Sequence, residues 1–317
     1  MDYLKRRHLL LASGAALLPP LMAGCGGANA QETLPFPDVA DTKYASAELV
    51  TFMNSYFAAK TRRDVSTTMS FFSPDLVTYI DATLGWDVAG FSALQGLFAQ
   101  YMAQWPSTAK SYPTRIVGDM TGAMIAFTDT PELFGGELRL QGIVDFKDGR
   151  IVRWVDYWDS RGWENNFGLP KTQLLNLRES QVPARASYRF KTTGQQLAQT
   201  LGIGNAAAAV ALFSEDAIYE DTALRLRLQG ARQIKRYFDR AITQLPHGTG
   251  STLRHLAGND AGGAVEWVSA PGAPTRSGMS ALVLDSDAKI IRCSVMYDGG
   301  WYSSPQLLAL GALSFDN

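Results

Sequence analysis

The stretch Phe72-Ser-Pro-Asp-Leu-Val-Thr-Tyr-Ile-Asp81 returns later in the chain as Phe213-Ser-Glu-Asp-Ala-Ile-Tyr-Glu-Asp221, with one residue fewer. After this repeated stretch, each copy continues through a glycine into an amphipathic segment. Each copy also closes on a second matching stretch, residues 148–159 in the first copy and 287–298 in the second. An internal repeat of this length predicts two tandem domains of the same fold.

The length and composition fit two ordinary domains. The chain has 317 residues, of which 46% are hydrophobic, and this is enough to build two cores. We expect an export signal and tether over residues 1–30, a first domain over 45–163, a linker over 164–194 and a second domain over 195–305. The formal charge is only -1, so the composition does not favour nucleic acid as a partner.

The N-terminus reads as an export signal. Lys5-Arg6-Arg7 precedes a short apolar run that is too short for a stable membrane anchor. Met22-Ala-Gly-Cys25 resembles a bacterial lipobox, and Ala28-Asn-Ala30 resembles an ordinary cleavage site. The first predicts a periplasmic protein attached to the membrane through a lipid on Cys25. The second predicts a soluble periplasmic protein cleaved after Ala30.

The order of periodic segments predicts an α+β fold. In each copy helical spacing comes first, including a helix near 194–201 in the second copy, and several strands follow. Helices followed by a run of strands are typical of α+β proteins rather than of alternating α/β proteins. His247 and His255 lie in a loop and a strand, and Cys293 lies in an apolar strand. These positions predict neither a metal site nor a cofactor.

This order of elements and the repeated strings resemble the nuclear-transport-factor-2-like superfamily. That superfamily includes ketosteroid isomerases, polyketide cyclases and limonene-type epoxide hydrolases. The resemblance implies two cone-shaped domains, each a curved antiparallel sheet wrapped around three helices with an apolar pocket inside, as in a cystatin-like α+β barrel. It also implies acid–base chemistry, although a fold of this kind hosts many functions.

Three pieces of the chain resemble the isomerases. Asp221 matches the general base of those enzymes, and Asp81 holds the same place in the first copy. Tyr56 matches their oxyanion-binding tyrosine. Gln141 falls where they have a second hydrogen-bond donor. The resemblance therefore implies a base and two donors in the first domain.

The closing strand of the first copy resembles the epoxide hydrolases instead. Trp154-Val-Asp156-Tyr-Trp158-Asp159 matches their signature, so Asp156 would be the acid or base. Asp129 would be its partner carboxylate and Tyr79 a water-positioning tyrosine. Phe127 stands where those enzymes have an arginine, and this departure argues against epoxide hydrolysis in its usual form. Alternation places Trp154, Asp156 and Trp158 on one face of a strand.

Ordinary structural roles compete with these assignments. Asp81 and Asp221 end strands, where aspartate is common in turns, and Tyr56 lies on an apolar helix face typical of a core. Arg153 and Arg292 alternate off the Asp156 face, so we expect them on the outer surface.

The two copies are not equivalent in polar residues. The second has Ser280 at the position of Gln141 and Val295 at that of Asp156, and it leaves Asp221 with Glu266 and two other polar neighbours. We therefore expect the fuller site in the first domain, with the second replacing the partner of a dimer. The catalytic candidates are Asp81, Asp156, Tyr56, Asp129 and Asp221, and the candidates for substrate binding are Tyr79, Gln141, Trp154, Trp158, Trp86 and Tyr219.

Two hypotheses of function follow. The first is an exported acid–base enzyme, an isomerase, cyclase or epoxide-opening catalyst, that acts on an apolar polyketide-, terpenoid- or steroid-like molecule. The second is a lipoprotein that binds a hydrophobic ligand or assists assembly without chemistry. Either protein could form a further homodimer.

Overall fold

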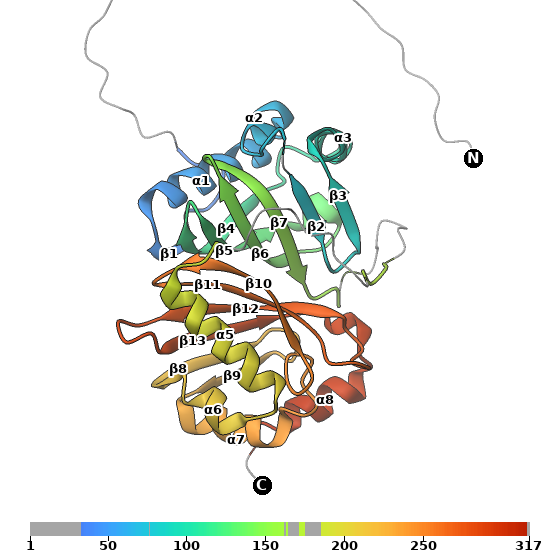
Figure 1. The fold of residues 1–317 in the computed structure, drawn as a ribbon. Helices are drawn as coiled ribbons and strands as arrows, with labels where there is room; N and C mark the ends of the chain where they lie inside the picture. The colour runs from blue at the N-terminus through green and yellow to red at the C-terminus, as the bar shows by residue number, and fades with distance from the viewer. Residues whose placement is uncertain (1–32, 76, 162, 164–170, 175–184, 316–317) are drawn as a thin grey trace, which may run out of the picture. The chain divides into compact units, whose positions relative to one another are not determined.

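The computed structural model describes residues 33–75, 77–161, 163, 171–174 and 185–315, and residues 34–317 form one compact unit. Figure 1 shows the described part of the first copy in blue to green and that of the second in yellow to red. The predicted signal, with Cys25 and Ala30, and much of the predicted linker lie outside the described residues. The processing sites and the start of the linker at residue 164 stay predictions.

The first copy folds into helices and one seven-stranded sheet. The sheet order is β1-β4-β5-β6-β7-β2-β3. The elements are β1 (Asp41–Ala45), α1 (Ala47–Thr61), α2 (Val65–Ser70), β2 (Thr78–Asp81), β3 (Trp86–Ala89), α3 (Phe91–Met102), β4 (Ser111–Asp119), β5 (Gly122–Asp129), α4 (Pro131–Phe134), β6 (Leu138–Lys147) and β7 (Arg150–Trp158).

The second copy repeats this plan in a six-stranded sheet of order β10-β11-β12-β13-β8-β9. Its elements are α5 (Tyr188–Gly202), α6 (Ala206–Val210), β8 (Phe213–Asp221), β9 (Leu226–Gln229), α7 (Ala231–Ala241), β10 (Thr252–Asn259), β11 (Gly262–Val268), β12 (Ser277–Leu284), β13 (Ile290–Met296), the short 3-10 helix η2 (Gly299–Trp301) and α8 (Ser304–Ala312). The order β4-β5-β6-β7-β2-β3 of the first sheet is therefore matched strand for strand, and the predicted α+β class is confirmed.

Both sheets are mixed rather than purely antiparallel. Four consecutive strands pair antiparallel in each copy, and the strand that carries the quoted motif then joins in parallel, β2 beside β7 and β8 beside β13. A parallel neighbour requires a long connection between the two strands. The intervening helix and strands of each copy supply that connection, so the motif strand lies next to the closing strand.

The same backbone feature starts the third helix in both copies. Gly90 and Gly230 precede α3 and α7 with φ of 89° at each, a conformation that suits glycine. Their N–H groups donate to the carbonyl oxygens of Val77, just before β2, and of Ala217, in β8, at 3.0 and 2.8 Å. The repeated glycine thus ties the start of the helix to the motif segment in both copies.

One boundary expectation is wrong. The linker was expected to reach residue 194, but α5 begins at Tyr188. Ser187 caps this helix by accepting a hydrogen bond from the N–H of Phe190. Phe190, Leu197 and Leu201 are buried along one face, so the helix starts within the segment that was expected to be linker.

The two sheets pack against each other through the faces turned away from their helices. Buried residues of both copies form one apolar cluster there, including Ile143 and Val155 of the first and Met279 and Val283 of the second. Contact of two sheet faces buries the alternate residues of each strand. Each copy therefore has a core between its sheet and helices, and a third cluster joins the sheets.

This packing corrects the expectation for Arg153. Its side chain is 0% exposed and pairs with Glu266 of the second sheet. Tyr157 also donates to Glu266, at 2.6 Å. Arg153 does point away from the first core, as alternation predicted, but the second sheet covers it. Arg292, at the matching position, is only half-buried and pairs with Glu220.

Candidate active site

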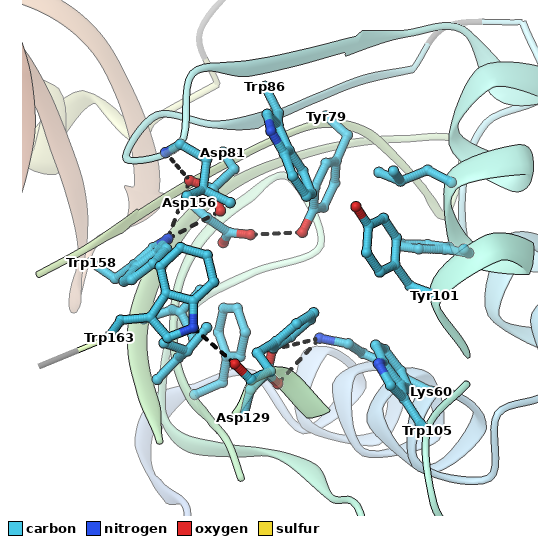
Figure 2. A pocket seen from close by; sticks show the side chains of 17 residues that line it. Lys60, Tyr79, Asp81, Trp86, Tyr101, Trp105, Asp129, Asp156, Trp158 and Trp163 are labelled. Carbon is cyan, nitrogen blue, oxygen red and sulfur yellow. Dashed lines mark hydrogen bonds and ion pairs between the residues drawn. The ribbon is translucent and has the colours of Figure 1, made fainter. Parts of the chain in front are cut away.

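The first copy encloses a cavity of about 70 Å3 between its sheet and its helices. Aromatic and leucine side chains form most of its wall, and the polar groups stand at two places. Figure 2 shows Asp81, Asp156 and Tyr79 on one side, with Asp129 and Lys60 on the other. The lining residues are Lys60, Tyr79, Asp81, Leu84, Trp86, Leu97, Phe98, Tyr101, Trp105, Phe127, Asp129, Phe134, Leu138, Leu140, Asp156, Trp158 and Trp163.

Asp156 enters the cavity from the middle of β7. Its carboxylate accepts hydrogen bonds from the indole N–H of Trp154 and from the hydroxyl of Tyr79, the latter at 2.8 Å. Gly142 faces Asp156 in register on β6. A Cβ at Gly142 would lie 2.9 Å from the Asp156 Oδ1 atom, so glycine there makes room for the carboxylate. Burial, with the charge of Asp81 next, raises the pKa of Asp156 to about 8.

Asp81 ends β2 beside Asp156. It accepts hydrogen bonds from the backbone N–H groups of Thr83 and Leu84, at 3.0 and 2.8 Å, as a turn aspartate does. The indole N–H of Trp158 also donates to it, at 3.0 Å. Burial raises the pKa of Asp81 to about 6 although these donors act in the opposite direction. Asp81 is thus both a turn residue and a cavity residue.

A second polar pair lies across the cavity. Lys60, at the C-terminal end of α1, binds Asp129 of β5 at 3.3 Å, and both side chains are buried. The hydroxyl of Ser111 also donates to Asp129. The Lys60 ammonium lies 5.2 Å from the centre of the Phe127 ring. Asp129 is therefore neutralised by Lys60, which the sequence analysis did not single out.

Two predicted donors of the isomerase type do not line this cavity. Tyr56 is buried in the core under it, with its ring centre 5.3 Å from that of Trp154. Gln141 lies on the opposite face of β6, in a cleft toward the second copy. The assignment of Gln141 to the same site as Asp81 is wrong, because side chains on a strand alternate between faces and a count over several residues is off by one.

The tryptophans take different places. Trp158 and Trp86 line the cavity, and Trp86 stacks on Tyr101 with ring centres 5.7 Å apart. Trp154 lies behind the lining, where it orients Asp156. Trp154 therefore acts on the site by holding the Asp156 carboxylate in place.

The second copy buries its matching aspartate completely. Asp221 is 0% exposed and accepts hydrogen bonds from the N–H of Leu224, at 2.9 Å, and from Tyr297, at 3.4 Å. Burial raises its pKa to about 7. Tyr219 contacts His247 at 3.0 Å. Glu266 does not accompany Asp221 as predicted, because it lies on the other face of its strand against Arg153.

Within the described residues, no group of three or more histidine, cysteine or acidic side chains could hold a metal ion. No helix in the described ranges is long and apolar enough to cross a membrane.

Comparison with known proteins gives matches only among solved structures. No protein-family model matches the chain, and no curated protein does. The similar structures are NTF2-like, ketosteroid isomerase-like and polyketide cyclase-like cystatin-fold proteins. An NTF-2-like protein of unknown function from Burkholderia xenovorans LB400 is 17% identical, with a TM-score of 0.30, over 40% of this chain and 95% of that chain.

Two further structures carry names of enzymes. A protein of Kribbella flavida named as a ketosteroid isomerase is 17% identical, with a TM-score of 0.30, over 35% of this chain and 77% of its own. A protein of Sinorhizobium meliloti named as a polyketide cyclase is 22% identical, with a TM-score of 0.29, over 35% of this chain and 99% of its own. At these values the matches assign no role to any residue of this chain, and the architecture rests on its own strand order.

Proposed function

We propose that the protein is an acid–base enzyme that acts on an apolar small molecule in the cavity of its first copy. The observation that carries this proposal is the pair Asp81 and Asp156. Both line one aromatic-walled cavity, Asp156 fully buried and Asp81 half-buried, and their pKa values of about 6 and about 8 lie on either side of neutrality. Pairs of titratable groups whose environments separate their pKa values are typical of acid and base partners.

The roles follow from these protonation states. Near pH 7 Asp156 is mostly neutral and can donate a proton to an oxygen of the substrate. Asp81 is mostly ionised and can accept a proton from an attacking water or hydroxyl group. The two transfers balance, because one proton leaves Asp156 as another arrives at Asp81. General acid–base catalysis of this kind contributes ~100-fold to 10,000-fold in rate.

The opening of an epoxide is the reaction that this geometry favours. It needs a donor at the leaving oxygen and a base at the nucleophile, which Asp156 and Asp81 supply. The isomerase alternative needs two donors at one oxyanion, but Tyr56 and Gln141 do not line the cavity. The aromatic wall suits a compact apolar substrate with a single oxygen function.

Binding without chemistry is the second candidate. The lining is predominantly aromatic and aliphatic, and one of its three carboxylates is neutralised by Lys60. A hydrophobic ligand held only by contact would use the same wall without Asp156.

The test compares hydrolysis of apolar epoxides, such as styrene oxide and cyclohexene oxide, by the wild type and by three variants. Product diols are measured by mass spectrometry in isotopically labelled water. Asp156→Asn and Asp81→Asn should each lower the rate at least ~100-fold. Asp221→Asn, the matched change in the second copy, should leave it unchanged.

Other outcomes distinguish the alternatives. Exchange of α-protons of apolar ketones in deuterated water, lost in Asp81→Asn, would favour the isomerase. Binding of an apolar fluorescent probe that is unaffected by Asp156→Asn, together with no turnover of either substrate class, would favour the binding protein and contradict the proposal.

We also propose that the chain is exported and lipid-anchored through Cys25, which lies outside the described residues. In bacterial cells, labelled palmitate should enter the wild type and not Cys25→Ser, and the variant should leave the membrane fraction. Equal labelling of both proteins would contradict the anchor, and a soluble wild type would support cleavage at Ala30.

A further inference from the structure

A second cavity lies between the two sheets, on the face of the first sheet turned away from the proposed active site. It is a cleft of about 430 Å3 with polar side chains from both copies. Arg115, Ala126 and Gln141 face it from the first copy and Glu220, Thr222 and Ser294 from the second.

The floor of the cleft is one register row across three strands. Arg115 of β4 pairs with Ala126 of β5, and Ala126 pairs with Gln141 of β6. Neighbouring strands lie about 4.8 Å apart, so the backbones of Arg115 and Gln141 are separated by roughly twice that distance. The small side chain of Ala126 leaves the space between the two polar side chains open.

Two polar atoms at the ends of this row are unpaired within the described protein. Gln141 is only 6% exposed, and its Oε1 atom has no hydrogen-bond partner there. The buried Nε atom of Arg115 has none either. Asp41, the carboxylate in its reach, is 3.9 Å away, and the Nη1 atom of Arg115 makes only a 3.4 Å contact with Ser294. Native proteins rarely leave such groups unsatisfied.

The acidic wall does not occupy Arg115. Glu220 binds Arg292 at 2.8 Å and accepts the Ser294 hydroxyl at 2.7 Å. Its charge is therefore balanced within the second copy. The Nε atom of Arg115 makes no hydrogen bond, so the planar guanidinium still has a donor for an anion.

We infer that this cleft is a binding site for a small carboxylate that carries a hydroxyl or similar hydrogen-bonding group at its other end. The carboxylate binds Arg115, the other end binds the amide of Gln141, and the carbon chain lies over Ala126. Phe127 and Leu140 line both this cleft and the cavity of the first copy, so they separate the two sites. The proposed enzyme activity is not needed for this site.

Three probes of equal carbon length test the inference on the full chain by calorimetry and by NMR of the labelled protein. γ-Hydroxybutyrate has both end groups, butyrate lacks the hydroxyl, and butanol lacks the carboxylate. We expect γ-hydroxybutyrate to bind at least about tenfold more tightly than either of the other two, which corresponds to the net free energy of about one hydrogen bond.

Variants assign the two ends. Arg115→Met should remove the advantage over butanol, and Gln141→Leu should remove the advantage over butyrate. Ala126→Leu, which adds no charge, should block all three probes. Asp156→Asn, in the other cavity, should bind as the wild type does.

Several results would overturn the inference. Equal or undetectable binding of the three probes to the wild type is one of them. This result is obtained without any variant, so it does not depend on whether the variants fold. Spectral changes centred on the first-copy cavity, or loss of binding in Asp156→Asn with retention in Ala126→Leu, would place the ligand elsewhere.

Discussion

Asp81 and Asp156 stand opposite each other in register on the neighbouring parallel strands β2 and β7, and both side chains enter the same cavity. Strands of one sheet are about 4.8 Å apart, so the charge of either carboxylate opposes ionisation of the other. Different hydrogen-bond donors then give the two carboxylates different pKa values. Asp81 receives two backbone N–H groups and an indole, whereas Asp156 receives an indole and a phenol.

The first prediction is a bell-shaped dependence of kcat/KM on pH with a maximum near pH 7. Activity should rise as Asp81 loses its proton near pH 6 and fall as Asp156 loses its proton near pH 8. The two limbs belong to the coupled pair and are measured together from a full profile. An activity that stays constant between pH 5 and pH 9 would contradict the assignment of both roles.

The second prediction concerns the Tyr79 hydroxyl, which donates to Asp156 and lowers its pKa. Tyr79→Phe removes this donor, so the pKa of Asp156 should rise further. The alkaline limb of the profile should therefore move to higher pH while kcat falls. Tyr101→Phe, another tyrosine of the lining, serves as the control and should leave the limb in place. A shift to lower pH in Tyr79→Phe would show that Tyr79 does not stabilise the ionised carboxylate.

The third prediction compares the two matching arginines. Arg153→Met leaves Glu266 buried without its main ion-pair partner, which costs about 3–5 kcal/mol. Arg292→Met breaks a partly exposed pair with Glu220 and should cost less than about 1 kcal/mol. Urea denaturation of the wild type and the two variants measures both losses in the free energy of unfolding. Similar losses for the two variants would mean that the packing of the sheets does not bury Arg153 in solution.

The fourth prediction concerns Asp221 and stability. Its pKa of about 7 in the folded protein lies above the usual value of ~4, so the folded state binds the proton more tightly. The stabilisation from this group is fully present below pH ~4 and is lost as pH rises through 7. Asp221→Asn cannot ionise, so it should be more stable than the wild type at pH 8 by a few kcal/mol.

The comparison at pH 4 completes this test, because the wild type and Asp221→Asn should then differ little. The exposed Asp216→Asn controls for a general loss of negative charge. A wild type that is as stable as Asp221→Asn at pH 8 would contradict the burial of Asp221.

The sequence predicted most of the architecture because the repeat records the same strand order twice. It also placed Trp154, Asp156 and Trp158 on one strand face, since alternation along a single continuous strand has no gap across which to lose count. The repeated motif ends at Asp81, and this position predicted that Asp81 belongs to the site. In each of these cases the pattern lies within one short continuous segment.

The errors arise where position depends on a second segment. Gln141 is assigned only by its distance along the chain from the matching motifs, and an error of one residue moves a side chain to the opposite face of a strand. Lys60 ends an apolar helix, where a lysine is ordinarily solvated, and only the distant Asp129 shows otherwise. Arg153 faces away from its own core as expected, and no local pattern reveals that another sheet covers it.

The start of α5 is a different case, because its signal was present in the sequence. Ser187 is a good N-cap, and Phe190, Leu197 and Leu201 follow at helical spacing. Pro170 and Pro183 in the preceding segment are typical of a linker and compete with that pattern. A cap followed by periodic apolar residues is the better guide to a helix start.

The most direct test of the central claim is an NMR titration of the labelled aspartate carboxyl carbons in the wild type, assigned with Asp156→Asn and Asp81→Asn. Asp156 should titrate near pH 8 and Asp81 near pH 6, and removal of Asp81 should lower the pKa of Asp156. If Asp156 instead titrates near pH 4, as an exposed aspartate does, it is ionised throughout the neutral range and cannot be the acid.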